Sequence, residues 1–133
     1  MSVFAPEPEW QNLDWHRSCV AAGALCILRC GSCGTWRQPP RRYCGSCWSG
    51  DAAFEPVGGN GVVASLAVSH RALDPAWADK VPFATLVIEL AEGPRVLARF
   101  DGSPDSVAIG DPVTVTVEPV RNDFVLLDAQ LVG

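Results

Sequence analysis

Apolar and polar residues alternate in five short runs of the second half of the chain, and this alternation is the pattern of strands with one buried face. The runs are residues 61–69, 83–90, 95–100, 113–117 and 124–127. Gly, Pro and Asp residues separate them, Glu92-Gly93 predicts a hairpin turn, and no long helix is predicted between any two runs. We therefore predict a mainly β chain that ends in a five-stranded barrel of the OB-fold type, because closing a small sheet removes its exposed edges.

A helical period replaces this alternation near the N-terminus, where proline and acidic residues stand at the start of an apolar stretch and Gly23 stands near its end. One face of this helix carries Trp10, Leu13, Val20 and Ala24, and a second face carries Trp15, Cys19 and Ala22. The pattern predicts a helix over residues 8–25 with more apolar surface than one small neighbour can cover. That surface either packs on another protein or folds back on the chain's own β domain.

Six cysteines lie between positions 19 and 47, and four of them form two Cys-Gly-Ser-Cys pairs. Such a pair places two sulfurs on one side of a tight knuckle, and its glycine lets backbone N–H groups point at the thiolates. Two facing knuckles make a tetrahedral cage that suits Zn²⁺ at about 2.3 Å and leaves no open position for water. We predict a structural zinc site at Cys30, Cys33, Cys44 and Cys47, in a ribbon over residues 26–55 that leads into the barrel over residues 56–133.

Other uses of these cysteines stay open at this level. Two redox dithiols or two disulfides would fit the count, although a redox Cys-x-x-Cys pair belongs at a helix N-terminus in a βαβ unit, which this short Gly-rich segment does not predict. Four thiolates also bind iron, but rubredoxin-type sites space their knuckles more widely, which favours zinc. Cys19 and Cys26 are predicted to be small buried residues rather than further ligands.

The segment between the two pairs combines aromatic residues, prolines and arginines: Trp36, Arg37, Gln38, Pro39, Pro40, Arg41, Arg42 and Tyr43. The two prolines exclude a helix and stiffen the loop, so that the aromatic and arginine side chains stand on a preformed support. Because protein interfaces are enriched in these residue types, we predict a recognition surface here. The alternative is that the arginines only balance the negative charge of a zinc tetrathiolate and remain in solvent.

Charge divides the chain into two parts. The net charge is −5 over 133 residues, but residues 15–50 hold five arginines and no carboxylate, whereas residues 51–133 hold twelve acids and five bases. The acidic half repels phosphate, which argues against nucleic-acid binding. No apolar run approaches the roughly 18 residues that span a bilayer, and no basic export signal precedes the apolar residues 20–28. We expect a cytoplasmic protein without membrane contact.

A catalytic constellation is not evident in the sequence. His16 and His70 are the only histidines, and no cysteine or serine is placed to work with either. The run of residues 58–61, Gly-Gly-Asn-Gly, lacks the following helix and the Lys-Ser/Thr pair of a phosphate loop, so it is predicted to be a turn or bulge that starts the barrel. Chemistry is therefore expected to belong to a partner.

The order of these features resembles one known family, the DUF35 proteins, which are acyl-CoA-associated OB-fold proteins with a rubredoxin-like zinc ribbon. The resemblance spans about residues 10–120 and rests on a helix followed by Cys30, Cys33, Pro39-Pro40-Arg41, Cys44, Cys47, Gly59-x-Gly61 and the barrel strands. Members of that family act as small non-catalytic subunits of thiolase-fold enzymes.

This resemblance implies that the helix and ribbon dock on a thiolase-like catalytic subunit in a hetero-oligomer, and that the OB-fold shapes its acyl-CoA channel. It implies that the four cysteines of the two pairs bind zinc. The implied partner interface comprises Trp10, Leu13, Trp36, Pro39, Pro40 and Arg41. From charge alone we infer candidate contacts to the CoA phosphates at Arg37, Arg41 and Arg42.

The leading hypothesis is an accessory subunit, with no catalysis of its own, of a thiolase-like enzyme that acts on acyl-CoA thioesters. Retro-aldol cleavage of steroid side chains is the most specific form of this hypothesis, and an acyltransferase or a MaoC-type enoyl-CoA hydratase is the alternative partner. A single-stranded nucleic-acid binder is a rival because a ribbon and an OB-fold occur together in such proteins. An iron-bearing electron carrier is a third reading.

Overall fold

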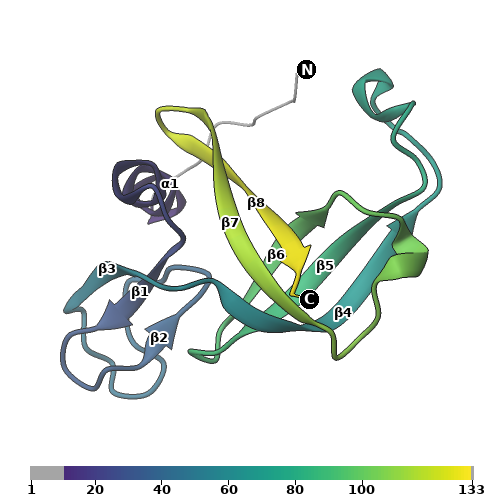
Figure 1. The fold of residues 1–133 in the computed structure, drawn as a ribbon. Helices are drawn as coiled ribbons and strands as arrows, with labels where there is room; N and C mark the ends of the chain where they lie inside the picture. Colours follow the sequence, from purple (N-terminus) through teal and green to yellow (C-terminus); the bar gives the residue numbers. More distant parts are fainter. Residues whose placement is uncertain (1–10, 133) are drawn as a thin grey trace.

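The computed structural model describes residues 11–132. A helix, α1 (Gln11–Ala22), precedes a small sheet of β1 (Cys26–Cys30), β2 (Trp36–Arg37) and β3 (Ala52–Pro56). There follow β4 (Asn60–Ser69), η1 (Pro75–Trp77), β5 (Phe83–Leu90), β6 (Arg95–Phe100), η2 (Pro104–Ser106), β7 (Pro112–Arg121) and β8 (Phe124–Leu131), where η marks a 3₁₀ turn. Figure 1 shows α1 and the small sheet on one side of the larger β domain. Within the described part of the chain, no helix is long and apolar enough to cross a bilayer.

The larger β domain is a closed barrel with the strand order β4-β5-β6-β8-β7. Its neighbouring strands are antiparallel, except that β6 and β8 run parallel. The fold class is therefore as predicted: mainly β, with an N-terminal helix, a ribbon and a five-stranded OB-like barrel. Strands β7 and β8 extend beyond the predicted runs, to Arg121 and Leu131. The added end of β7 is mostly exposed, so its residues do not alternate in hydrophobicity.

Alternate residues of the barrel strands point into one hydrophobic core. In β5, Ala84, Leu86, Ile88 and Leu90 are buried and Glu89 is exposed, which is the period that the sequence showed. Each fully buried aliphatic side chain contributes about 2 kcal/mol to folding. The same core cluster extends into α1 and the ribbon through Trp15, Cys19, Leu25, Cys26 and Ile27. The ribbon, helix and barrel thus share a core rather than being tethered by a loose linker.

The chain passes from the ribbon to the barrel through Gly59, which approaches β7 closely. Gly59 has φ of +80°, and a Cβ built on it would lie 2.2 Å from the carbonyl oxygen of Val115. Its own carbonyl accepts a hydrogen bond from the Val115 N–H at 2.7 Å. Only glycine fits such a position. Any other residue would be strained in this left-handed conformation, and its Cβ would collide with the neighbouring strand. The glycine run predicted to start the barrel therefore marks this approach, and the register shift of β4 comes later, between Val63 and Ser65.

Helix α1 folds back on the chain's own β structure, the second of the two alternatives that its apolar surface allowed. It ends at Ala22 because Gly23 takes φ of +64° and donates its N–H to the Cys19 carbonyl at 2.9 Å. The helix packs against β1, β3 and β8. Its buried face carries Trp15 and Cys19, and Leu13 is partly buried. The predicted first turn, including Trp10, lies outside the described residues.

Two hydrogen bonds that the sequence did not predict hold the helix in this position. The indole Nε1 of Trp15 donates to the carbonyl of Cys26 at 2.6 Å, which ties α1 to the start of β1. The imidazole Nδ1 of His16 accepts from the N–H of Val125 at 3.0 Å, which ties α1 to β8. The first residue therefore orients the helix on the ribbon and the second orients it on the barrel.

Candidate metal centre and ribbon surface

The two Cys-x-x-Cys pairs form knuckles with the same backbone hydrogen bonds. In the first, the Cys30 N–H donates to the Thr35 carbonyl at 2.8 Å and the Gly34 N–H donates to the Cys30 carbonyl at 3.0 Å. In the second, the Cys44 N–H donates to the Ser49 carbonyl and the Trp48 N–H donates to the Cys44 carbonyl, both at 2.9 Å. Positions 30 and 44, and positions 34 and 48, are thus equivalent in the two turns.

The four knuckle sulfurs converge on one point. The Sγ atoms of Cys30 and Cys47 lie 3.6 Å apart, those of Cys33 and Cys44 lie 3.5 Å apart, and all four lie within 4.8 Å of one another. Four thiolates at about 2.3 Å from a tetrahedral zinc ion are about 3.8 Å from each other, whereas a disulfide requires about 2.05 Å. The separations therefore fit a shared metal ion and not two disulfides. A closed set of four thiolates is the donor set of a structural zinc site.

Backbone N–H groups prepare this site for a cation. The N–H groups of Cys33 and Ser32 lower the pKa of the Cys30 thiol to about 6, and those of Cys47 and Ser46 lower the pKa of the Cys44 thiol to about 7. The Ser49 N–H also lowers the pKa of Cys47, but the surrounding sulfurs of Cys33, Cys30 and Cys44 outweigh it and raise that pKa to about 12. Two sulfurs thus carry thiolate character readily, and the thiolate is the form that binds a cation.

Cys19 and Cys26 lie outside the metal cluster, as predicted. Both are buried in the shared core, and the Cys26 N–H donates to the Cys19 Sγ at 3.3 Å. Burial raises the pKa of Cys19 to about 12, so this sulfur stays protonated. These two cysteines act as small core residues at the junction of α1 and β1.

Arg37 lies inside the ribbon rather than on its surface, and the structure corrects its predicted placement beside Arg41 and Arg42. Its side chain is 5% exposed, and its Nη1 and Nη2 donate to the carbonyls of Arg41 at 2.7 Å and Ser49 at 3.2 Å. A guanidinium carries several donors in a rigid fork, so it can tie the loop to the second knuckle through two carbonyls at once. Arg41 and Arg42 are exposed, so they are the accessible arginines of this loop.

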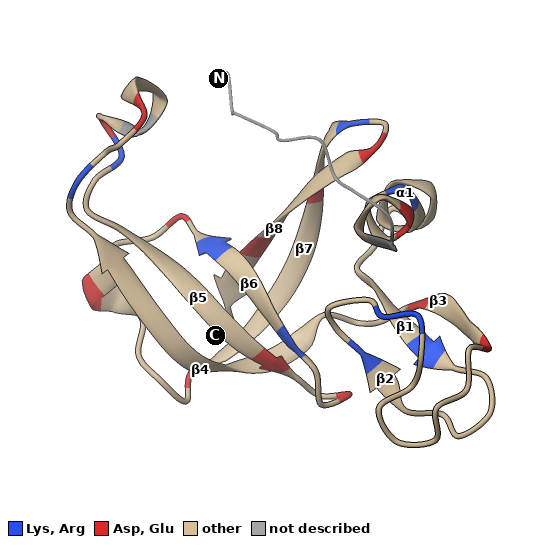
Figure 2. Cartoon of the chain, turned by 180° about the vertical axis from the view of Figure 1, so that it is seen from behind, with Lys and Arg blue, Asp and Glu red and all other residues tan. Residues whose placement is uncertain are grey.

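The other residues predicted for the recognition surface differ in how much they present to solvent. Pro39 is exposed and Pro40 is buried. Trp36 is partly buried, and the Arg29 guanidinium covers its ring at 4.7 Å from the centroid. Figure 2 shows the basic side of the ribbon, on β1, β2 and the loop that follows. The side chains of Arg29 and Arg37 therefore help to hold this part of the ribbon in place, while Arg41 and Arg42 are exposed.

Sequence reasoning did not select Trp48, which is the most exposed aromatic residue of the ribbon. Its side chain is 81% exposed and that of Tyr43 is 56% exposed. A signal for Trp48 was present in the sequence, since Cys33 is followed by glycine and Cys47 by tryptophan in two otherwise matching pairs.

A cavity of about 470 Å³ separates the ribbon from the turn between β5 and β6. Arg37, Gln38 and Glu92 line it, and each has one buried atom without a hydrogen-bond partner in the described structure: Nε, Oε1 and Oε1 respectively. Buried polar atoms without partners are costly unless another molecule or water satisfies them. The junction between ribbon and barrel is therefore polar, and these three atoms are shielded from solvent within it.

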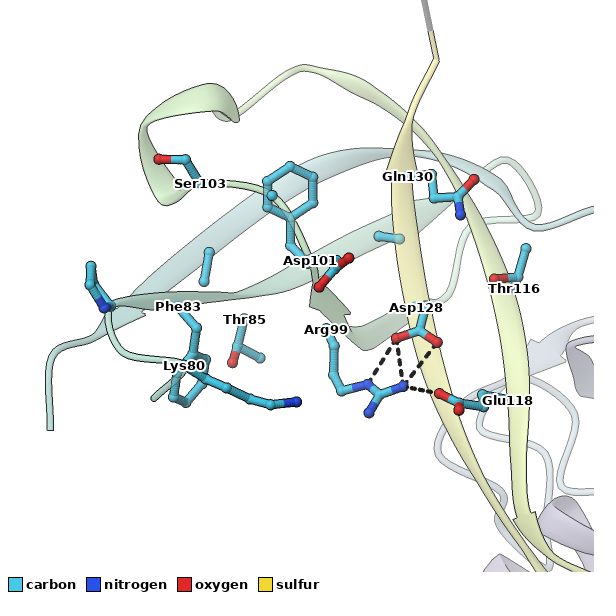
Figure 3. Close-up of a pocket in the computed structure, with 15 residues that line it drawn as sticks. Lys80, Phe83, Thr85, Arg99, Asp101, Ser103, Thr116, Glu118, Asp128 and Gln130 are labelled. Atoms are coloured by element: carbon cyan, nitrogen blue, oxygen red, sulfur yellow. Dashed lines mark hydrogen bonds and ion pairs between the residues drawn. The ribbon is translucent and has the colours of Figure 1, made fainter. Parts of the chain in front are cut away.

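A second cavity, of about 680 Å³, opens on the barrel, where Phe83 and Phe100 contribute apolar surface. Figure 3 labels Phe83 among the residues that line it. Arg99 lies in it, and its Nε and Nη2 donate to the Asp128 carboxylate at 2.8 and 2.9 Å while Nη2 also pairs with Glu118. Two carboxylates compensate this arginine, so it does not make the cavity a phosphate site. His70 is exposed and does not line this cavity.

Comparisons with known proteins agree with this geometry. Residues 20–53 match the family described as the ChsH2 rubredoxin-like zinc ribbon domain, and residues 54–118 match the ChsH2 C-terminal OB-fold domain. A solved structure described as an Ltp2-ChsH2(DUF35) aldolase matches with a TM-score of 0.82 and 30% sequence identity, over 96% of this chain and 98% of that chain. The ribbon match agrees with the four-thiolate geometry, and the cofactor of this site is structural zinc.

Curated proteins also match this chain. A probable enoyl-CoA hydratase alpha subunit of Thermomonospora curvata is 37% identical over 92 residues, which is 68% of this chain and 28% of that protein. The benzoylsuccinyl-CoA thiolase subunit BbsA of Thauera aromatica is 32% identical over 71% of this chain and 64% of that protein. This chain thus spans about a quarter of the first relative and just under two thirds of the second.

A DUF35 domain-containing scaffold protein of Methanothermobacter thermautotrophicus is 32% identical over 97 residues, which cover 71% of this chain and 72% of that protein. Together with the near full-length structural match, this relative shows the family of the whole arrangement of helix, ribbon and barrel. The chain belongs to the DUF35 family.

Proposed function

We propose that this chain is an accessory subunit that docks on a thiolase-like catalytic chain and helps to form its acyl-CoA site. The observation that carries this proposal is the structural match over nearly the whole chain to a subunit of a DUF35-containing aldolase. The relatives described as a thiolase subunit and a hydratase alpha subunit belong to the same area of CoA-thioester chemistry. Each of these proteins contains a segment similar to this chain, and their descriptions give different activities.

We propose that this chain contributes no catalytic group of its own. Its metal site has four thiolate donors and so leaves no position for a substrate or a water molecule. His16 is held by Phe124 and Val125 in the interior contact of α1, where its Nδ1 already accepts a hydrogen bond. The reacting groups are therefore assigned to the partner, and this chain provides shape and docking contacts.

The ribbon is the proposed docking face. Pro39 and Arg41 are exposed on it, Leu13 and Trp36 are partly buried, and Pro40 is buried. We propose these residues, together with Trp10, as the interface. The exposed arginine and proline of this stiff loop support docking here, because arginine is enriched in protein interfaces. Arg41 and Arg42 are the proposed contacts to CoA phosphates at the edge of this face.

The proposed docking and channel-lining roles belong to successive segments of the chain. We propose that residues 8–25 and 26–55 form the docking helix and ribbon, and that residues 56–133 form the barrel that lines the acyl channel. The step from β3, which ends at Pro56, to β4, which begins at Asn60, supports this division. The cavity with Phe83 and Phe100 offers apolar surface for such a lining.

Among the possible reactions we propose retro-aldol cleavage of the side chain of a steroid CoA thioester, and a hetero-oligomer in the cytoplasm as its setting. The solved structure with the high TM-score is described as an aldolase, which supports lyase chemistry over acyl transfer or hydration. Thiolase-type acyl transfer is the second choice, supported by the relative described as a thiolase subunit.

The test is reconstitution from separate chains. This chain is co-expressed with a thiolase-like catalytic chain from the same source, the complex is isolated, and cleavage of a 3-hydroxyacyl-CoA thioester of a steroid is followed by product release. The complex is expected to turn over, while this chain alone is not. Turnover by this chain alone would contradict the accessory role, and a complex that cleaves no 3-hydroxyacyl-CoA but condenses or thiolyses acyl-CoA would replace aldol chemistry with thiolase chemistry.

A further inference from the structure

The two knuckles of the metal site differ at one position in a way that their own geometry does not require. Gly34 has φ of +78° and the equivalent Trp48 has φ of +65°. This left-handed region favours glycine because a Cβ crowds the backbone there. Among residues 11–132, Trp48 is the only residue other than glycine with a positive φ. The first knuckle shows that glycine satisfies the turn, so the tryptophan has another cause.

Packing within the chain does not supply that cause. Trp15 is 8% exposed and makes a hydrogen bond through its indole, and Trp36 packs on the core under Arg29. Trp48 is 81% exposed, so its indole gains little burial in return for the strained backbone. Strained backbone positions persist where the surrounding structure holds them for a function, and binding sites are such places.

The surroundings of Trp48 have the chemistry of an interface anchor. Tyr43 precedes the knuckle and Trp48 closes it, and the hydrogen bond from the Cys44 N–H to the Ser49 carbonyl brings these two ends of the turn together. The Tyr43 ring lies over Gly50, where a Cβ would be 3.6 Å from its Cε1. Tryptophan, tyrosine and arginine are the residues that carry most binding energy in protein interfaces. Arg42, beside Tyr43, is exposed.

Charge indicates what kind of surface this patch meets. Arg41 and Arg42 are exposed next to Tyr43, whereas Arg37 is buried and Arg29 pairs with Glu55, so the patch is basic through Arg41 and Arg42 on the side of Tyr43. The exposed Asp51 follows the turn. A complementary partner surface has an apolar pocket for the indole and carboxylates around its rim. A protein surface fits this description better than a nucleic acid, because the strongly acidic barrel next to the ribbon repels a polyanion.

We propose that Trp48, with Tyr43 and Arg42 beside it, anchors the ribbon in an apolar pocket with an acidic rim on the catalytic chain, and that the left-handed backbone at position 48 holds the indole outward for this purpose. The inference rests on the proposed function for the identity of the partner. It names Trp48 as the residue on which the affinity for the catalytic chain depends most. It also predicts that replacing Trp48 weakens binding without lowering the stability of the fold.

The decisive variant is Trp48→Gly, which removes the strain and the indole together. Relief of the backbone conformation offsets the greater freedom of glycine in the unfolded chain, so the Tm is expected to stay the same or rise by a few °C. Zinc content is expected to remain that of the wild type. The Kd for the purified catalytic chain, measured by calorimetry, is expected to rise about 30-fold or more, the effect of losing a hot-spot tryptophan.

Two further substitutions separate the indole from the backbone. Trp48→Asn keeps a residue that tolerates the left-handed region but lacks an aromatic ring, and it is expected to weaken binding as much as Trp48→Gly does. Trp48→Phe keeps an aromatic ring and is expected to retain most of the affinity. Trp36→Leu is the matched control for stability, because it removes a partly buried tryptophan of the same ribbon and is expected to lower the Tm.

Several outcomes would overturn the inference. A Tm of Trp48→Gly well below that of the wild type would mean that the indole packs within its own chain. Wild-type binding that survives within threefold in both Trp48→Gly and Trp48→Asn would remove Trp48 as an anchor. An association rate of Arg42→Glu equal to that of the wild type would contradict the acidic rim proposed on the partner. If the wild type itself binds no thiolase-like chain, the proposed function fails and the docking role falls with it, whereas the first two outcomes leave the proposed function intact.

Discussion

The imidazole of His16 links the N-terminal helix to the last strand of the barrel, because its Nδ1 accepts a hydrogen bond from the N–H of Val125 at 3.0 Å. Its ring also stacks on Phe124, with the two centroids 4.4 Å apart. Burial lowers the pKa of His16 from its ordinary value of 6.5, the nearby Asp123 raises it by less, and Arg121 lowers it further. The neutral ring is thus the form that fits between α1 and β8, since a protonated Nδ1 cannot accept the Val125 hydrogen bond.

The folded protein is therefore expected to lose stability as the pH falls below neutrality. Above about pH 6.5 His16 is neutral in both the folded and the unfolded chain, and its contribution is fully present. As the pH falls from there to the lowered folded-state pKa, the unfolded chain binds a proton that the folded chain excludes, so the free energy of unfolding decreases. Urea unfolding of the wild type at pH 7.5 and 5.5 measures this change.

The control for that measurement is His16→Gln, whose side-chain oxygen can still accept from Val125 but does not titrate. The stability difference between the two pH values is expected to be smaller in this variant than in the wild type. Equal differences in both proteins would show that other groups carry the pH dependence. His16→Leu removes the acceptor and is expected to cost about 1–2 kcal/mol at pH 7.5.

Gly59→Ala is expected to destabilise the protein by about 2–4 kcal/mol, because the new Cβ would have to move the backbone of β7 and also adopt a positive φ. Gly93→Ala is the matched variant, since Gly93 also has a positive φ, of +111°, but nothing lies within 4 Å of the position of its Cβ. Its cost is expected to be about 1–2 kcal/mol. Denaturant unfolding compares the two, and equal losses would mean that the contact with Val115 does not constrain Gly59.

Cys47→Ser is expected to abolish stoichiometric zinc binding, because an alcohol in place of one thiolate opens the tetrahedral site. The wild type is expected to hold one zinc ion per chain by elemental analysis of protein purified without added metal. Cys19→Ala is the control: it removes a sulfur from the core and is expected to leave the zinc content unchanged while lowering stability by about 1 kcal/mol. Zinc loss in Cys19→Ala, or its retention in Cys47→Ser, would contradict the assigned ligand set.

Trp15→Phe is expected to lower stability by about 1–3 kcal/mol, since it leaves the Cys26 carbonyl without its buried donor. Trp36→Phe, which keeps an aromatic ring under Arg29, is expected to cost less. Thermal unfolding of both variants tests this order. A smaller loss in Trp15→Phe than in Trp36→Phe would mean that the hydrogen bond from α1 to the ribbon contributes little.

Local patterns account for the parts of the structure that were predicted well. Strands β5 and β6 begin and end at the predicted residues, because side chains alternate between core and solvent along their whole length. The metal cluster could also be predicted from the sequence, because its four ligands lie within 18 positions of one another and define its geometry locally. The ends of β7 and β8 were missed: the end of β7 is mostly exposed, and β8 continues through the buried Ala129 to Leu131 because its backbone stays paired with β7.

Chemical type and spacing along the chain thus specified the metal cage, the barrel strands and the helix, because each depends on residues that are near neighbours in sequence. Contacts between distant segments assigned the roles of individual side chains. Arg37 carries the same chemistry as Arg41 and Arg42, yet packing turns it inward onto the carbonyls of Arg41 and Ser49. His16 meets a strand 109 positions later. The backbone angle at Trp48 is that of the local turn, as at Gly34, but the exposure of its side chain follows from how the second knuckle is seated on the rest of the ribbon.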